Sequence, residues 1–499
     1  MMHGIHKVRL IRKEVARDIV FTGFPLKTCG NDRQKQSLRT VILGLDPGIQ
    51  TAFNFNTKRT KALCVLILLF SILVCASTAS AAAIADREIL PNGLTLLHTE
   101  KNALPMIRVV VAIKAGSIAE TAARAGLANL TADLLNEGTV RRSSKEISEA
   151  IEFVGGSLQT SGGADFVTAT LSVLKKDMDL GFDLLSDILL NPVFSEQEVN
   201  RRRALIKGSI QQQREEPGIV ASKAFMKELF DDHPYGWPTE GTEETLDAIT
   251  RQDIVDFHKE YYAPNNAIMA VVGDISKDEL RAMLDRYFGK WEKKQIQTRR
   301  LPELRPAAGP RVIKIQKEIT QANIILGHSG IARENPDYYA VSVMNYILGG
   351  GGFASRLVDN IRDNKGLSYD VHSSFAPQKY GGTFSVGLQT KNQTAQIAID
   401  EILREMNRIR TEPVSDRELD DAKAYLTGSF PLRVDSNSKI AGFLISIEYY
   451  DLGLNYIDNY RQYIEKVTKE EVQRVARKYL NTKDYLLVIV GDLKKTDLK

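Results

Sequence analysis

An internal repeat limits the folds available to this chain of 499 residues. The segment Thr250–Asp274 recurs as Thr468–Asp492, with a constant offset of 218 residues between matching Thr, Tyr and Gly positions. In each copy a capping box opens a helix, and an apolar run ending in Gly-Asp follows. A second match joins Pro192–Ser209 to Pro413–Ser429 at offsets of 220 and 221 residues. Two matches at nearly one offset predict two domains of similar fold.

Strand and helix patterns alternate in both copies of the repeat. Apolar residues spaced seven and four apart, such as Val199, Ile206 and Ile210, predict helices between the strands. We therefore expect an α+β fold of two homologous domains, each a mixed and mostly antiparallel sheet packed with helices. The expected domains are residues 87–297 and 311–499, joined by a linker over residues 298–310. The predicted strands are Arg108–Ile113, Phe166–Leu174, Ile268–Val272, Val312–Gln316, Ile324–Leu326, Thr383–Leu388 and Leu486–Val490.

The charge of the chain is unevenly distributed. Residues 1–61 contain twelve Lys and Arg against four Asp and Glu, so the formal charge of +4 comes from this segment and the remainder is acidic. Proteins that bind nucleic acid carry a basic patch or stripe, which the remainder gives no reason to expect. We therefore exclude nucleic acid as a partner.

A secretory signal is predicted over residues 62–81. Lys58, Arg59 and Lys61 precede an uncharged run, Ala62–Val74, and a small-residue cleavage site follows at Ala79–Ala81. The run is about thirteen residues long, shorter than the ~20 that a membrane span needs. We expect an exported protein, periplasmic if the source is a Gram-negative bacterium, with no stable membrane span after cleavage; the alternatives are an uncleaved anchor and a lipid-anchored Cys75. Residues 1–61 form an N-terminal extension without an assigned fold.

The sequence Ala125–Thr139 resembles the zinc helix of the insulinase-like metallopeptidases, the family of pitrilysin and mitochondrial processing peptidase. The resemblance extends over about residues 87–499 and includes His233–Gly236 and a glycine-rich segment in the family's order. It implies a domain pair that forms half of a clamshell chamber. It also implies a zinc metalloendopeptidase family, in which two histidines and a glutamate in His-x-x-Glu-His bind zinc and activate water.

The zinc motif is degenerate in this chain. Asn129, Ala132 and Asp133 stand where the resemblance places histidine, glutamate and histidine, and Gly208-Ser209 stand where it places the third ligand. An amide is a poor zinc ligand and alanine cannot accept a proton. We expect no metal and no cofactor on this chain, and a helix that is simply packed; an altered metal site is the alternative. No two histidines after residue 81 have helical ligand spacing.

A second site is predicted in the C-terminal domain. Arg362 and Tyr369 match, in type and spacing, the pair with which the family binds substrate and stabilises the oxyanion, so the resemblance implies a catalytic role for both. A guanidinium and a phenol can together stabilise developing negative charge. The alternative interpretation is a surface arginine paired with Asp363 or Asp359, and a tyrosine packed on a strand.

A glycine-rich segment precedes this pair. It resembles the substrate-recognition loop of the family, and four consecutive glycines let a backbone approach a peptide closely. The same residues could instead form a helix terminus and a turn. The predicted substrate-binding residues are Gly349, Gly350, Gly351 and Gly352.

Two functions are consistent with these features. The first is the non-catalytic, zinc-free subunit of an exported heterodimeric peptidase, inactive alone, whose similar-length partner carries zinc on an intact motif and whose substrates are peptides. The second is a scaffold or peptide-binding homodimer without a peptidase role. Retention of Arg362 and Tyr369 favours the first, because a scaffold has no chemical reason to keep them.

We predict that the exported protein begins immediately after Ala81. Because Cys29, Cys64 and Cys75 all precede that point, thiol titration of the denatured mature protein should give zero. N-terminal sequencing of exported material measures the cleavage site directly, and a sequence that began before Ala62 would contradict the prediction.

Overall fold

The computed structural model describes residues 84–297, 299–304, 309–496 and 498. The predicted N-terminal extension and signal peptide lie outside these residues, as do residues 298 and 305–308 of the predicted linker. Among the helices of the described part, none combines the length and the apolar character needed to cross a bilayer.

The first half of the described chain is built on a six-stranded sheet in the order β1-β2-β6-β3-β5-β4. The β2–β6 pair is parallel, and the other neighbouring strands run antiparallel. The sequence predicted β3, β5 and β6 and missed the other three. The strands are β1 (Asp86–Ile89), β2 (Thr95–Glu100), β3 (Met106–Ile113), β4 (Ser157–Gly162), β5 (Val167–Leu174) and β6 (Ala267–Gly273).

The second half repeats this topology in a five-stranded sheet, β7-β11-β8-β10-β9. Its one parallel pair is β7–β11, which corresponds to β2–β6, and the remaining pairs are again antiparallel. The predicted α+β class, with mostly antiparallel mixed sheets, is therefore confirmed; β9 was not predicted. The strands are β7 (Arg311–Gln316), β8 (Gln321–Ser329), β9 (Val371–Gln378), β10 (Gly381–Lys391) and β11 (Leu486–Gly491).

The helices also recur in matching positions, and their caps explain where they start. Ser195 and Ser415 cap the equivalent helices α7 and α14, while Thr250 and Thr468 cap α10 and α17. The predicted capping box is complete at Thr250, whereas Thr468 accepts only the backbone N–H of Glu471. The helices of the first half are α4 (Leu127–Leu134), α5 (Ser144–Phe153), α6 (Met178–Leu190), α7 (Glu196–Gln213), α8 (Pro217–Phe230), α9 (Glu243–Ala248), α10 (Arg251–Tyr261) and α11 (Lys277–Phe288). Those of the second half are α12 (Tyr338–Asn345), α13 (Ala395–Thr411), α14 (Asp416–Ser429), α15 (Asn437–Tyr449), α16 (Tyr456–Glu465) and α17 (Lys469–Tyr479).

Both sheets are covered on both faces, which explains why their central strands are almost uniformly apolar. In β3, Val109 and Val111 face the core formed with α4, α6 and α10, while Val110 and Ala112 face the opposite core. In β11, Val488 faces α8 and Ile489 faces the helices of its own half. Every residue of β6 and β11 is buried.

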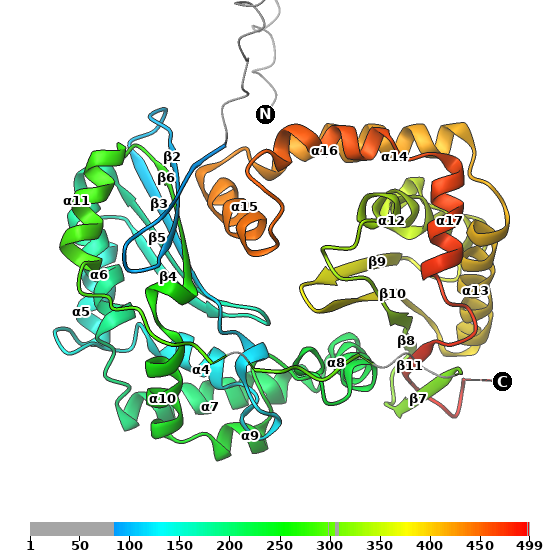
Figure 1. The fold of residues 1–499 in the computed structure, drawn as a ribbon. Helices are drawn as coiled ribbons and strands as arrows, with labels where there is room; N and C mark the ends of the chain where they lie inside the picture. The colour runs from blue at the N-terminus through cyan, green and yellow to red at the C-terminus, as the bar shows by residue number, and fades with distance from the viewer. Residues whose placement is uncertain (1–83, 298, 305–308, 497, 499) are drawn as a thin grey trace, which may run out of the picture. The chain divides into compact units, whose positions relative to one another are not determined.

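The two halves exchange one helix each. Helix α15 belongs to the second half but packs on β3 and β6 of the first sheet, and α8 belongs to the first half but packs on β8 and β11 of the second (Figure 1). Phe225 of α8 is 3% exposed and reaches β8, where its ring lies against Gly327. Neither sheet therefore completes its core with residues of its own half.

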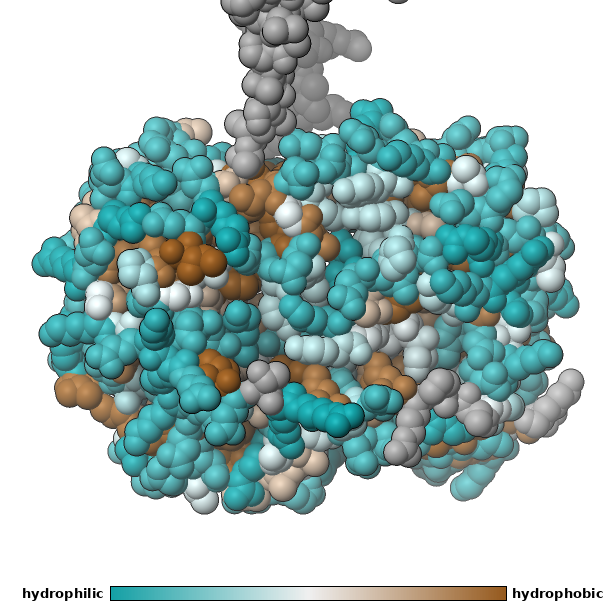
Figure 2. Space-filling model, viewed as in Figure 1, coloured by the Kyte–Doolittle hydropathy of each residue, from teal (hydrophilic) through white to brown (hydrophobic). Residues whose placement is uncertain are grey.

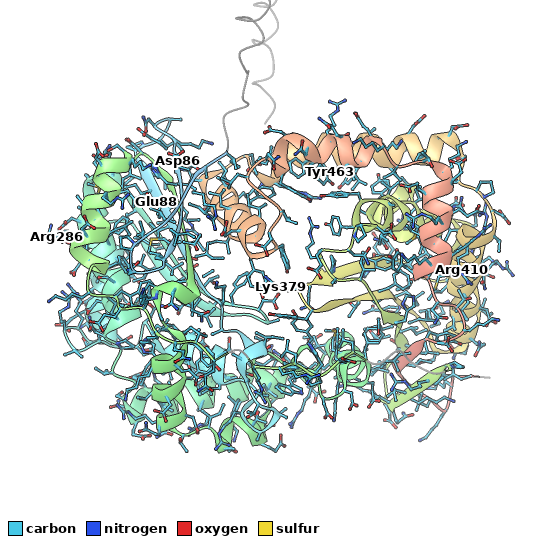
Figure 3. All side chains as sticks on the ribbon, in the orientation of Figure 1. Asp86, Glu88, Arg286, Lys379, Arg410 and Tyr463 are labelled. Carbon is cyan, nitrogen blue, oxygen red and sulfur yellow. The ribbon has the colours of Figure 1, made fainter. Side chains whose placement is uncertain are left out.

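Polar contacts reinforce this junction. The Tyr235 hydroxyl donates to the buried Asp165 carboxylate at 2.5 Å, and the Phe166 ring meets Tyr449 of α15 edge-on at 5.4 Å. Lys379, labelled in Figure 3, extends from the turn between β9 and β10 and donates to the Tyr449 carbonyl at 2.8 Å. Burial raises the pKa of Asp165, against the hydrogen bonds it accepts from Tyr235 and Tyr449. The motif containing Tyr235 therefore helps to join the halves.

The exterior is mainly hydrophilic. On the face drawn in Figure 2, hydrophobic residues occupy separate small areas between charged and polar side chains. Isolated apolar side chains on a surface are ordinary, so these areas alone do not identify a binding site.

We predict that Phe225→Ala lowers the free energy of unfolding by roughly 3–5 kcal/mol, because it leaves a cavity between α8 and the second sheet. Urea unfolding followed by circular dichroism measures the change. The matched control is Phe153→Ala on α5, whose side chain is 90% exposed and whose loss should cost less than about 0.5 kcal/mol. Equal effects of the two changes would contradict the exchange of helices.

Candidate functional site

The segment that resembles the zinc helix folds into α4, which packs in the core of the first half. Gly126 precedes it with φ +97°, and a Cβ at this position would lie 2.7 Å from the Glu240 carbonyl oxygen, so the turn requires glycine. The buried Glu120 carboxylate accepts the N–H groups of Gly126 at 3.0 Å and Ala128 at 2.6 Å. Burial raises the pKa of Glu120 to about 8, although both hydrogen bonds act in the opposite direction.

The three positions that the resemblance predicts to be degenerate, Asn129, Ala132 and Asp133, all lie on α4. Asn129 is half-buried, and the end of β4 packs on it so closely that a Cβ on Gly162 would lie 2.5 Å from the Asn129 Cα. Ala132 is fully buried. Asp133 is half-buried, and desolvation raises its pKa although the charge of Arg202 lowers it. Leu127, Leu130 and Leu134 are buried, in keeping with the packed helix that the sequence predicts.

Ion pairs connect the end of α4 to α7. The Glu137 carboxylate accepts Arg202 Nε at 2.7 Å and Arg201 at 2.5 Å, and it also accepts the Ser144 hydroxyl at 3.0 Å. Burial opposes ionisation of Glu137, but the two arginines outweigh it and lower its pKa. These donors occupy both oxygens of the Glu137 carboxylate, so Glu137 is not free to bind a metal ion.

The residues present do not fit a zinc ion. Gly208 and Ser209, at the place of the family's third ligand, are exposed on α7, and nothing lies within 4 Å of a Cβ built on Gly208. Together with Asn129 and Ala132 they offer neither imidazole nor a carboxylate. Among the described residues, no group of three His, Cys, Asp or Glu side chains is arranged to hold a metal ion.

The histidines are engaged separately. His98 and His258 each lie 2.9 Å from a backbone carbonyl, and His233 Nδ1 accepts the N–H of Tyr235 within its turn. His328 Nε2 accepts the N–H of Asn481, which fixes a neutral tautomer, and burial lowers its pKa. His372 is largely exposed, 3.5 Å from Asp370. None of these contacts resembles a nucleophile and base pair.

Arg362 and Tyr369 are brought together in the second half. Arg362 lies on a π-helical turn, Val358–Asn364 (η8), and its guanidinium carbon is 5.2 Å from the centre of the Tyr369 ring. The same carbon lies 4.5 Å from the centre of the Phe353 ring. Phe353 is 77% and Tyr369 87% exposed, so the arginine contacts two aromatic residues that are open to solvent.

The alternative interpretation of this pair agrees with the geometry in part, because Arg362 is ion-paired with Asp363 as that interpretation proposed. Arg362 has a hydrogen bond only to Asp363 among the described residues, at a long 3.5 Å, and Asp359 is not paired with it. Tyr369 does not pack on a strand, because it precedes β9 with its ring exposed. The Arg362 side chain is 26% exposed and Tyr369 is 87% exposed, so both can donate to a ligand carrying negative charge.

The four glycines have different roles. Gly349 and Gly350 end a π-helical turn, Tyr346–Gly350 (η6), and Gly349 is buried with its Cβ position 2.7 Å from the backbone nitrogen of Ser373. A Cβ on Gly351 would meet the Tyr346 carbonyl oxygen at 2.7 Å. Gly352 has φ +56° with open space around it. The glycine-rich segment therefore forms a helix terminus and a turn, which was the alternative interpretation. Gly350–Gly352 are nevertheless accessible at the protein surface.

Phe353 was missed by the sequence analysis, although it directly follows the glycines. A single aromatic residue has no spacing signal, and its contact with Arg362 arises only when its own short turn, Gly352–Ala354 (η7), packs against η8. The arrangement offers two hydrogen-bond donors, two exposed rings and an accessible backbone. Chemically it suits an extended peptide with a carbonyl or carboxylate near Arg362.

Two family profiles match the chain. "Insulinase (Peptidase family M16)" matches residues 97–243, and "Peptidase M16 inactive domain" matches residues 248–426. An uncharacterised zinc protease of Mycobacterium leprae is 29% identical over 415 residues, which cover 81% of this chain and 91% of that protein. Another from Bacillus subtilis is 27% identical over 412 residues, covering 80% and 96%.

Solved structures share the fold. A structure titled as the peptidase M16 inactive domain from Pseudomonas fluorescens superposes with a TM-score of 0.78 at 28% identity, covering 83% of this chain and 100% of that one. A protease from Helicobacter pylori gives a TM-score of 0.77 at 22% identity, covering 82% and 99%, which supports the fold alone. With both family profiles, the repeated topology and these relatives in agreement, the chain belongs to the insulinase-like peptidase family M16.

Proposed function

We propose that this protein is the zinc-free subunit of an exported, two-chain insulinase-like peptidase. Its role is to supply Arg362 and Tyr369 to peptide bound at the zinc site of a partner of similar length. One observation carries the proposal: the described residues offer no metal-binding group, yet Arg362, whose ion pair with Asp363 is long at 3.5 Å, lies beside the exposed ring of Tyr369.

The chemistry of the pair supports this role. Attack of water on a peptide carbonyl concentrates negative charge on the carbonyl oxygen, and fixed donors directed at that oxygen stabilise the transition state. The Arg362 guanidinium supplies a permanent charge, and the two rings beside it limit its orientation. The Tyr369 phenol supplies a second donor. Because α4 offers no metal site, we assign the activation of water to the partner.

The partner should be recognisable from its sequence. We expect a two-domain chain of similar length with an intact His-x-x-Glu-His helix, encoded next to this one. The scaffold or homodimer alternative predicts no such neighbour. Co-expression of the two chains followed by size-exclusion chromatography distinguishes a heterodimer from a homodimer.

We predict that the purified mature chain binds no stoichiometric zinc and cleaves no peptide, because Asn129, Ala132 and Asp133 supply neither ligands nor base. Elemental analysis after dialysis measures the metal content. A variant with Asn129→His, Ala132→Glu and Asp133→His should bind zinc more weakly than one that also carries Ser209→Glu, since three protein ligands are needed. About one tightly held zinc ion per wild-type chain would contradict the prediction.

We further predict that Tyr369→Phe lowers turnover by the complex roughly 10²–10³-fold, because one oxyanion donor is lost. Assembly and zinc content should not change. Arg362→Ala should also be damaging, with part of its effect appearing as a higher KM. Steady-state peptide cleavage provides the measurement.

The matched control for the phenol is Tyr463→Phe on α16, which removes a hydroxyl from a ring that packs on Tyr339 (Figure 3). It should leave turnover unchanged. A Tyr369→Phe complex that worked at the wild-type rate would remove Tyr369 from the mechanism. If Arg362→Ala were silent as well, the scaffold function would be the better explanation.

A further inference from the structure

A cavity of about 270 Å³ lies in the second half, between α12, α14 and β9. Its size is at the lower end of the range for ligand pockets and suits one side chain rather than a long segment of peptide. Nothing assigned to the Arg362 and Tyr369 pair explains it. Its lining includes five aromatic residues, Tyr338, Tyr346, Phe375, Tyr425 and Tyr460.

The tyrosines give the cavity a mixed character. The Tyr346 and Tyr425 rings lie 4.9 Å apart at an interplanar angle of 33°, and Tyr425 is 57% exposed at the opening. The hydroxyl groups of Tyr338, Tyr346, Tyr425 and Tyr460 make no hydrogen bond to another described residue. The walls therefore combine apolar ring faces with free hydroxyl groups, which suits an aromatic ligand attached to a polar backbone.

One charge belongs to the cavity. Arg433 is the sole charged residue among those that line it, and in the described part of the chain it forms no ion pair. Its guanidinium carbon lies 5.5 Å from the centre of the Phe430 ring and 5.6 Å from that of Tyr460. An unpaired guanidinium favours a carboxylate on the ligand and disfavours lysine or arginine.

The cavity adjoins the glycine-rich segment. Gly350 forms part of its lining, and Gly351 lies against the Tyr346 ring, where an added Cβ would come within 2.8 Å. A peptide that followed Gly350–Gly352 toward Phe353 and Arg362 would therefore pass the opening of the cavity. A larger side chain at position 351 would therefore clash with the Tyr346 ring, which forms part of the cavity wall.

We propose that this cavity is a specificity pocket for an aromatic side chain of the peptide, with an acidic residue beside it that meets Arg433. This inference rests on the proposed function, because it assumes that peptide lies along the glycine-rich segment. It adds what that function leaves open, namely which peptides are selected. Aromatic side chains followed by Asp or Glu should be preferred, and those followed by Lys should be rejected.

The test uses the isolated mature chain and five blocked peptides, acetyl-Ala-Ala-X-Z-Ala-amide, titrated by calorimetry at low salt. The X-Z pairs are Phe-Asp, Leu-Asp, Ala-Asp, Phe-Asn and Phe-Lys. Phe-Asp should bind best, Leu-Asp next, and Ala-Asp at least about tenfold more weakly, because the buried ring is lost. Phe-Asn should bind about three- to fivefold more weakly than Phe-Asp, and Phe-Lys more weakly still.

Two variants locate the binding. Ser342→Trp places a large ring in the cavity and should weaken Phe-Asp at least about tenfold. Arg433→Gln leaves the cavity open and should abolish the preference for Asp over Asn while keeping that for Phe over Ala. Its matched control is Arg417→Gln on α14, where the side chain is 91% exposed, and this change should alter neither preference. Circular dichroism checks the fold, and Arg433→Gln decides the question if Ser342→Trp is misfolded.

The outcomes separate this proposal from the function on which it rests. Peptides that bind equally well whatever X is, or binding that neither variant alters, would overturn the pocket and leave the oxyanion role intact. Failure of all five peptides to bind would also overturn it. The proposed function is judged independently by turnover of the Tyr369→Phe complex, whereas the pocket is judged by the peptide preferences of the isolated chain.

Discussion

Reciprocal packing of α8 and α15 is the interaction on which the rest of the structure depends. Each helix covers an apolar sheet face that belongs to the other half, so burial of β11 and of β6 requires both halves at once. At roughly 25 cal/mol per Å² of buried apolar surface, faces of this kind are a large part of what makes a fold stable. The site residues in the second half are therefore held by a core to which the first half contributes.

The two sites that the family resemblance predicts differ in the structure. Around α4 the fold persists without the chemistry: Glu120 anchors the helix start and Glu137 joins its end to α7, but no ligand set remains. Around Arg362, the exposed rings of Phe353 and Tyr369 both lie beside the guanidinium. This contrast is the basis of the role that we propose for Arg362 and Tyr369 at another chain's reaction centre.

Much of the fold could be predicted from sequence because the repeat and the buried strands have regular signals. Strands covered on both faces read as continuous apolar runs, so β3, β6 and β11 were found, while the polar edge strand β4, Ser157–Gly162, has no such run and was missed. The exchange of α8 and α15 could not be predicted, because the apolar pattern of an amphipathic helix does not indicate which sheet the helix packs on. Arg362 and Tyr369 were found through the resemblance, whereas Phe353 and the lining of the cavity depend on contacts that only folding creates.

The exchanged helices also bear on what the connection between the halves is for. Helices α8 and α15 each pack in the core of the other half of the chain. A break in the peptide chain near the linker would therefore leave the two halves interlocked by two buried helices. The molecule is thus organised like a dimer whose two subunits share one polypeptide. Its linker keeps the effective concentration of the halves high during folding, and the interlock maintains their association afterwards.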